Sequence, residues 1–420
     1  MDRSKSDCHD RPGHGKLSRQ FRQHGFRGLT LGAEVISLGC RLNLSESEEL
    51  RALLAAEDQL VVVNSCAVTA EAVRQTRQAI RRARKARPGA RLLVTGCAAE
   101  VERAALCAMP EVDGLIPNTR KLDPRAWNVA PARNPGTAQH TRAFIAVQNG
   151  CDHACTFCVI PQGRGASRSL PVSAVLREVE RHLDSGAREV VLTGVDLTSW
   201  GHDLPNGARL GDLVRTMLGA FPALGRLRLS SLDGVEIDPL LFDLLAHEAR
   251  VMPHLHLSLQ HGDDLILKRM KRRHLRRDAV DLVERLRALR PDLALGADLI
   301  AGFPTESMAA DAANRSIVHE LGIVHGHVFP YSPRPGTAAA RMPQLDRAVI
   351  KARAAALRAE CEAVRSRWLT GQLGAPQRVL AERDGTGHAE NFARVRLAPA
   401  TLAGTLVTVT PTRISEGLLA

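Results

Sequence analysis

Short apolar runs alternate, from Glu34 onward, with stretches whose apolar residues recur at helical spacing. The apolar runs predict strands, and the stretches at 46–56 and 70–87 predict helices, because their apolar or alanine residues fall three and four positions apart. Alternating strands and helices are typical of a parallel α/β sheet, here flavodoxin-like. The strands are expected at residues 34–38, 60–63, 91–94 and 112–116.

A second alternating series begins at Phe144 and contains six apolar runs separated by helical stretches such as 172–183 and 278–289. Six βα units in succession predict a partial (β/α)6 barrel. Active sites of such barrels lie at the carboxyl ends of the strands. The strands are expected at residues 144–148, 189–192, 226–230, 254–259, 295–300 and 325–329.

The C-terminal part of the chain changes pattern once more. A long helical stretch at 345–370 is followed by runs that alternate like strands at 378–381, 392–396 and 406–410, which predict a small all-β barrel. Prolines and weak periodicity at 117–141 predict a linker. The expected domains are a disordered extension at 1–31, an α/β domain at 32–135, the barrel at 136–370 and the β domain at 371–420.

Charge and hydropathy narrow the class of protein. The 57 basic residues exceed the 45 acidic ones, for a net charge of +12, which favours a polyanionic partner such as nucleic acid. The arginine-rich, lysine-poor usage also fits a GC-rich genome, so charge alone leaves both explanations open. No apolar run approaches the roughly 20 residues that span a bilayer, and residues 1–27 lack the apolar stretch of a signal peptide. We therefore expect a cytoplasmic protein without membrane contact.

Three of the nine cysteines, Cys151, Cys155 and Cys158, stand within eight residues directly after the first predicted barrel strand. Three thiolates can hold three corners of one [4Fe–4S] cube and leave the fourth iron open. S-adenosylmethionine can chelate an open iron, and its reductive cleavage yields a 5′-deoxyadenosyl radical. The alternative is a zinc site, for which His153 could serve as a fourth ligand.

A second set, Cys40, Cys66 and Cys97, follows three predicted strands of the first domain. Carboxyl ends of parallel strands share one edge of a sheet, where ligands of open α/β folds bind. Three thiols there could hold a second cluster. The alternative is that they are buried core residues, as free cysteines often are.

These motifs together resemble the radical-SAM methylthiotransferase family over roughly residues 34–420. Within it, the stretch Cys66-Ala67-Val68-Thr69 is most similar to the branch that acts on N6-threonylcarbamoyladenosine at position 37 of tRNA. Ser65 stands where threonine is usual in the family. The matching stretches begin at Gly39, Val63, Thr95, Cys151, Leu192, Leu257 and Gly302.

The resemblance implies two [4Fe–4S] clusters, an auxiliary one on Cys40, Cys66 and Cys97 and a radical-generating one on Cys151, Cys155 and Cys158. It also implies S-adenosylmethionine, a TRAM-like C-terminal domain, a tRNA anticodon stem-loop as partner, and an electron donor such as flavodoxin or ferredoxin. The methylthio group would be transferred to carbon 2 of the adenine, a C–H bond unreactive enough to require a radical.

Further residues are candidates with weaker support. Gly194, Asp196, Ser231 and Gln260 follow barrel strands and could contact the cofactor, although ordinary loop polarity would also explain them. Phe157 would shield the cluster from water. The basic run around Lys271, Arg272 and Arg273 could track phosphates or form a solvated helix face.

Alternative functions remain open, two with the same chemistry and two of different classes. The same chemistry could act on isopentenyladenosine of tRNA, or on an aspartate of a ribosomal protein. A different class would be a non-catalytic iron–sulfur electron carrier, which would need neither a pocket for S-adenosylmethionine nor a basic surface. Another would be a zinc-bound RNA-binding protein.

Overall fold

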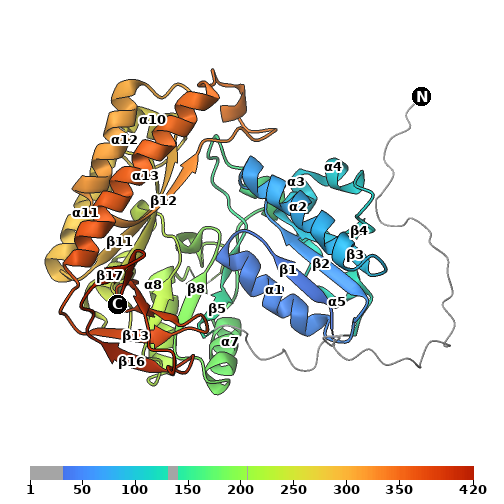
Figure 1. The fold of residues 1–420 in the computed structure, drawn as a ribbon, viewed down its shortest axis with the longest axis horizontal. Coiled ribbons are helices and arrows are strands. Elements are labelled where there is room, and N and C mark those ends of the chain that lie inside the picture. The colour runs from blue at the N-terminus through green and yellow to red at the C-terminus, as the bar shows by residue number, and fades with distance from the viewer. Residues whose placement is uncertain (1–31, 131–140, 206) are drawn as a thin grey trace. The chain divides into compact units, whose positions relative to one another are not determined.

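The computed structural model describes residues 32–130, 141–205 and 207–420 (Figure 1). The chain divides into two compact units. The first comprises Met1–Thr137 together with Val159–Gly165, and the second comprises Ala138–Cys158 together with Ala166–Ala420. The expected disordered extension at 1–31 lies outside the described residues. The sequence did not predict that Val159–Gly165 belongs to the first unit.

The first unit contains a four-stranded parallel sheet with the order β1-β2-β3-β4. The predicted parallel α/β class is confirmed. The order is sequential and does not reverse as it does in flavodoxin-like sheets. Its elements are β1 Glu34–Ser37, α1 Arg41–Leu53, β2 Leu60–Ser65, α2 Ala70–Ala86, β3 Arg91–Gly96, α3 Cys97–Val101, α4 Arg103–Cys107, β4 Gly114–Leu115, η1 Asn118–Arg120, α5 Pro124–Trp127 and α6 Ile160–Arg164.

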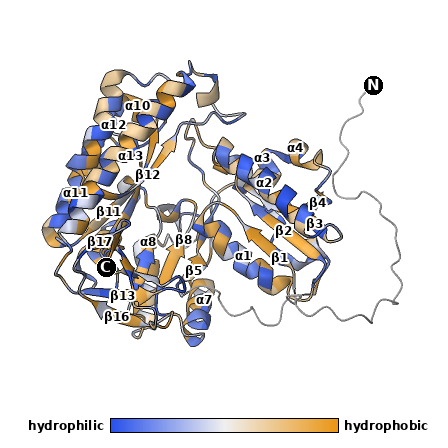
Figure 2. Cartoon of the chain, in the orientation of Figure 1, coloured by the Kyte–Doolittle hydropathy of each residue, from blue (hydrophilic) through white to orange (hydrophobic). Residues whose placement is uncertain are grey.

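Both faces of this sheet are covered, which is why β2 and β3 have runs of consecutive apolar residues (Figure 2). Val61 and Val63 on β2 pack with Ile80 of α2, whereas Val62 packs with Leu50 of α1. Trp127 of α5 is buried on the α1 side, and its indole N–H donates to the Lys121 carbonyl at 2.7 Å. Its burial explains why residues 124–127 of the predicted linker pack against the first unit.

The second unit contains six parallel strands in two sheets, β5-β8-β9 and β10-β11-β12, joined by bridges at Leu227–Val251 and Leu232–Leu257. This is the predicted partial barrel. Its elements are β5 Ala143–Ala146, β6 Gln148–Asn149, β7 Arg168–Ser169, α7 Val172–Asp184, β8 Val190–Thr193, η2 Leu197–Ser199, α8 Leu210–Ala220, β9 Leu227–Leu229, η3 Gly234–Glu236, α9 Pro239–His247, β10 His254–Gln260, α10 Asp264–Arg269, α11 Arg276–Leu289, β11 Ala294–Ala301, α12 Met308–Glu320, β12 Ile323–Pro330, η4 Ala339–Arg341 and α13 Arg347–Thr370.

The C-terminal strands form a mostly antiparallel six-stranded sheet with the order β16-β13-β14-β15-β18-β17. It has a small apolar core of its own, which includes Val379, Val395 and Leu419. The sequence predicted three of these strands. Their bounds are β13 Gln377–Ala381, β14 Thr386–Ala389, β15 Arg394–Arg396, β16 Leu406–Val409, β17 Ile414–Ser415 and β18 Leu418–Leu419.

A fully buried ion cluster joins this sheet to the barrel. Glu189 receives hydrogen bonds from Arg226 at 2.8 Å and from Arg228 at 2.9 Å. The remaining guanidinium nitrogens donate to backbone carbonyls of the C-terminal sheet, among them those of His388 and Ala389. All three charged side chains are at most 3% exposed. Among the described residues, no helix is both long and apolar enough to cross a membrane.

Replacing Glu189 with Gln should destabilise the second unit strongly. The change leaves two buried guanidinium groups without their counter-charge, and breaking a buried pair in this way typically costs about 3–5 kcal/mol. Urea denaturation followed by circular dichroism measures the loss. Glu178→Gln is the control, because Glu178 forms an ion pair with Arg181 but is 43% exposed. Equal midpoints for the two variants would contradict this account.

Candidate functional site

The loop that carries Cys151, Cys155 and Cys158 leaves the first barrel strand and is held by the other side of the barrel. The Thr156 N–H donates to the Met270 carbonyl at 3.1 Å, and its hydroxyl donates to the Arg269 carbonyl at 2.9 Å. All three thiols are half-buried. Thr156 therefore fixes the loop between the second and third cysteines.

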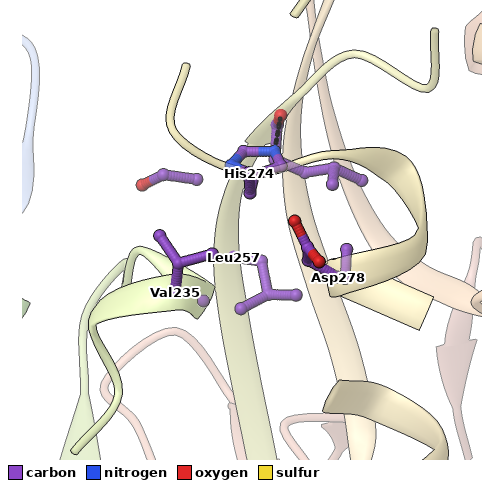
Figure 3. A pocket seen from close by; sticks show the side chains of 8 residues that line it. Val235, Leu257, His274 and Asp278 are labelled. Carbon is purple, nitrogen blue, oxygen red and sulfur yellow. Dashed lines mark hydrogen bonds between the residues drawn. The ribbon is translucent and has the colours of Figure 1, made fainter. Parts of the chain in front are cut away.

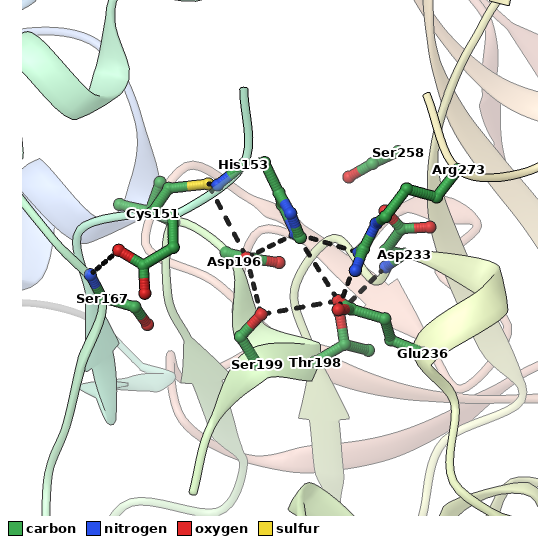
Figure 4. A network of polar contacts seen from close by, with 12 residues as sticks. Cys151, His153, Ser167, Asp196, Thr198, Ser199, Asp233, Glu236, Ser258 and Arg273 are labelled. Carbon is green, nitrogen blue, oxygen red and sulfur yellow. Dashed lines mark hydrogen bonds and ion pairs between the residues drawn. The ribbon is translucent and has the colours of Figure 1, made fainter. Parts of the chain in front are cut away.

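Acidic and basic side chains surround the loop, as Figure 4 shows. The Cys151 thiol lies 3.7 Å from the Asp196 carboxylate, and burial, followed by that carboxylate, raises the pKa of the thiol. His153 Nε2 lies 2.8 Å from Asp196 and 3.7 Å from Glu236. Hydrogen bonds to these two carboxylates raise the pKa of His153 to about 10. Its imidazole is thus paired with carboxylates, which weakens the interpretation of His153 as a fourth zinc ligand.

The arginines of the predicted RNA-binding run lie in this network. Arg272 donates to Asp233 at 3.0 Å and to the Cys155 sulfur at 3.7 Å, and its side chain is only 7% exposed. Arg273 forms an ion pair with Glu236 at 2.7 Å. Buried pairing leaves Arg272 unable to track phosphates, so the structure speaks against an RNA contact at this residue. Lys271 is exposed and stays a candidate.

The turn at Gly194 is held by a single side chain. Gln148 Oε1 accepts hydrogen bonds from the Val195 and Asp196 backbone N–H groups, at 3.0 and 2.9 Å. A Cβ on Gly194 would lie 2.9 Å from the same oxygen, so a larger residue there would displace the Gln148 side chain from these hydrogen bonds. Asp196 is thereby aimed at Cys151 and His153.

The other residues predicted to contact the cofactor lie at the ends of two strands and in the cysteine loop. Gln260 ends β10 with a φ of +71°, and Ser231 is half-buried beyond β9. Phe157 packs edge-to-face on Phe303, with ring centroids 6.4 Å apart. Contact of Gln260, Ser231 and Phe157 with the cofactor stays a prediction.

A small cavity lies near this region, between Val235, Leu257, His274 and Asp278 (Figure 3). Its volume of about 10 Å³ is that of a single water molecule. It is too small to admit S-adenosylmethionine, so the cofactor would not bind there.

The first unit brings Cys40, Cys66 and Cys97 together at the carboxyl edge of its sheet. Cys40 precedes α1 and is exposed, whereas Cys66 and Cys97 are buried. A Cβ on Gly39 would lie 2.6 Å from that of Cys66, so glycine allows the β1 and β2 loops to approach. Burial raises the pKa of Cys66 to about 11, and the neighbouring Cys97 and Cys40 add to the shift.

Buried charges lie beside these thiols. Glu46 accepts hydrogen bonds from Lys121 at 2.5 Å and from Arg164 at 2.9 Å, and all three side chains are 2% exposed. Two cations therefore face one carboxylate. Arg164 also interacts electrostatically with Cys97 and Cys40. A guanidinium group close to these sulfurs favours their thiolate form.

Both cysteine sets fit the group that their spacing predicted. Each presents three thiols, the number that holds a [4Fe–4S] cluster with one open iron. Sequence reasoning missed Glu46, Lys121 and Arg164, because lone charged residues are normally solvated and nothing in their spacing marks them. His153 was noted only as a possible metal ligand, and its pairing with Glu236 was not predictable.

Comparisons with known proteins agree with this arrangement. Residues 145–314 match the Radical SAM superfamily, and residues 33–117 match the Uncharacterized protein family UPF0004. The chain is 41% identical over 407 residues to the threonylcarbamoyladenosine tRNA methylthiotransferase MtaB of Rickettsia prowazekii, covering 93% of this chain and 97% of that protein.

Two further relatives differ in their named substrate. The MtaB protein of Aquifex aeolicus is 32% identical, with 89% of this chain and 98% of that protein covered. The tRNA-2-methylthio-N(6)-dimethylallyladenosine synthase of Erythrobacter litoralis is 33% identical, with 84% and 86% covered.

In metal-free protein, iodoacetamide should modify Cys40 before Cys66. Cys40 is exposed, whereas burial holds the pKa of Cys66 at about 11, so only on the order of 0.1% of it is thiolate at pH 8. Peptide mapping by mass spectrometry measures both rates. The Cys66 rate should rise about tenfold from pH 8 to pH 9. Equal rates at pH 8 would contradict the buried position of Cys66.

Proposed function

The chain belongs to the radical-SAM methylthiotransferases, and from that membership we propose that it transfers a methylthio group to carbon 2 of N6-threonylcarbamoyladenosine at position 37 of tRNA. The observation that carries the proposal is the 41% identity over 93% of the chain to a relative named for this reaction. The alignment with the relative named for dimethylallyladenosine has a lower identity, 33%, and covers less of both proteins. Isopentenyladenosine is therefore the second candidate substrate.

We propose that Cys151, Cys155 and Cys158 hold a radical-generating [4Fe–4S] cluster and that Cys40, Cys66 and Cys97 hold an auxiliary one. When bound, these groups and S-adenosylmethionine supply the radical and the sulfur for the reaction. An electron donor of the flavodoxin or ferredoxin class would reduce the cluster held by Cys151, Cys155 and Cys158. The proposed domains are 32–135, 136–370 and 371–420.

The chain's own residues have definable tasks in this proposal. Thr156 fixes the cysteine loop, and Gln148 aims Asp196 at it. Phe157 and Phe303 exclude water from one side of the loop. Arg272 places a positive charge 3.7 Å from the Cys155 sulfur, which favours the thiolate form needed for metal binding.

Changing one cysteine of each set should separate their tasks. Cys155→Ala should hold about half the wild-type iron and release no 5′-deoxyadenosine, because the open-iron cluster is lost. Cys66→Ala should also hold about half the iron, yet still cleave S-adenosylmethionine without forming methylthiolated product. Iron assay and liquid chromatography of anaerobically reconstituted protein measure these outcomes.

Cys361→Ala is the matched control, since Cys361 is a buried cysteine of α13 that belongs to neither set. It should retain iron, cleavage and product. Continued 5′-deoxyadenosine release by Cys155→Ala would overturn the assignment of the first set. Product formation by Cys66→Ala would overturn that of the second.

Transfer RNA from a strain lacking this gene should lose 2-methylthio-N6-threonylcarbamoyladenosine and accumulate the precursor without sulfur. Nucleoside digestion followed by mass spectrometry measures both species, and re-expression of the gene should restore the product. Persistence of this nucleoside with loss of the isopentenyl analogue would transfer the activity to the second candidate substrate. Unchanged tRNA in both respects would favour a protein substrate.

A further inference from the structure

Side chains on the barrel strands alternate between the surrounding helices and the barrel interior. On β10, Leu255 and Leu257 pack in the apolar core that includes Val283 and Leu286 of α11. His254 and His256 therefore point inward, because successive side chains of a strand lie on opposite faces. Barrel interiors are usually filled with branched aliphatic side chains. The imidazoles in this interior are unusual, and their buried nitrogens need hydrogen-bond partners.

The amino-terminal end of this interior is filled by the chain itself. Phe392, from the C-terminal sheet, stacks on His254 with ring centroids 4.6 Å apart and meets His325 edge-on at 5.5 Å. The Glu189 cluster lies at the same end, since Arg228 is within 5.1 Å of the Phe392 ring. Ring contacts with Phe392 therefore occupy this end of the interior.

One step further along the strands, three side chains from adjacent strands meet. His256 Nε2 lies 3.1 Å from Asp298 Oδ1, and His327 Nδ1 lies 3.2 Å from the same oxygen. Asp298 and His327 are direct neighbours in the β11–β12 register. Gly296 pairs with His256 in the β10–β11 register, and a Cβ there would overlap the imidazole ring. The packing of the three strands is thus built around this triad.

The triad leaves polar atoms available. Both imidazoles donate to Oδ1 of Asp298, so Oδ2 and the far nitrogen of His327 have no partner in the described part of the chain. The His327 side chain is 58% exposed and that of Asp298 is 22% exposed, whereas His256 is buried. Hydrogen bonds from His256 and His327 outweigh burial and lower the pKa of Asp298, which keeps it an acceptor.

The triad lies close to the cysteine loop. Ser258 is two residues beyond His256 on β10, a rise of about 7 Å. The Ser258 carbonyl accepts a hydrogen bond from Arg272 at 2.7 Å, and Arg272 in turn reaches the Cys155 sulfur. The rise of about 7 Å between His256 and Ser258 is comparable with the length of a purine base.

We propose that Asp298 and His327 bind the N6-threonylcarbamoyl substituent of the target adenosine, with Oδ2 accepting a ureido N–H and the far imidazole nitrogen accepting a hydrogen bond from the threonyl hydroxyl. This inference rests on the proposed function and names its specificity residues. An isopentenyl group offers no partner to either atom and would leave the carboxylate desolvated, which disfavours it.

The test compares binding of anticodon stem-loop RNAs that carry threonylcarbamoyladenosine, isopentenyladenosine or plain adenosine at position 37. Anaerobically reconstituted holoenzyme is titrated by fluorescence anisotropy. His327→Phe keeps a ring and removes both nitrogens, and Asp298→Asn removes the charge with little change of shape. Each should reduce the preference for threonylcarbamoyladenosine over adenosine by about tenfold or more, as expected for a lost hydrogen bond to a charged group.

His247→Phe is the matched control, because His247 makes the same kind of contact, 3.0 Å to Asp243, on the exposed face of α9. It should leave the preference unchanged. In turnover assays, the two triad variants should raise KM more than they lower kcat, since the lost contact exists before the reaction.

An unchanged preference in both triad variants would overturn the inference. It would also fall if the wild-type protein carried an additional zinc or iron ion that His327→Phe loses, because the three ligand atoms lie within 4.8 Å of one another and would then form a metal site. Failure of the proposed function is distinguishable: the wild-type protein would form no methylthiolated product from the threonylcarbamoyladenosine RNA.

Discussion

Parallel strands place their carboxyl ends at one edge of a sheet, and both candidate sites depend on that constraint. In the first unit, the loops after β1, β2 and β3 bring Cys40, Cys66 and Cys97 together. In the second, the loop after the first barrel strand carries three more thiols, and loops after later strands supply Asp196 and Arg272 around it. Residues distant in sequence thereby share one site without long-range covalent links.

Buried charge follows the same organisation. Glu46 with Lys121 and Arg164 lies beside the thiols of the first unit, and Arg164 interacts electrostatically with Cys97 and Cys40. In the second unit, Glu189 pairs with Arg226 and Arg228 while their remaining nitrogens donate to carbonyls of the C-terminal sheet. The first cluster lies beside thiols, whereas the second joins two parts of the fold.

The interior of the barrel divides into layers along its strands. Phe392 and its surrounding imidazoles close the amino-terminal end. The His256–Asp298–His327 triad occupies the middle, and the arginine–carboxylate network around the cysteine loop occupies the carboxyl end. In the middle layer Asp298 and His327 are partly exposed, which is where a polar substituent of a substrate would find partners.

The sequence by itself determined the parallel α/β class, the six barrel strands and the two cysteine sets, because apolar periodicity and local ligand spacing are properties of neighbouring residues. It also carried the family resemblance, and the identity to known methylthiotransferases confirms that family. Only the tertiary structure decided that Arg272 is buried beside Cys155, that Arg164 reaches Glu46 from 118 residues away, and that His256, Asp298 and His327 meet. These contacts join residues from separate strands and helices, so their partners are fixed by strand register and packing, which no local pattern encodes.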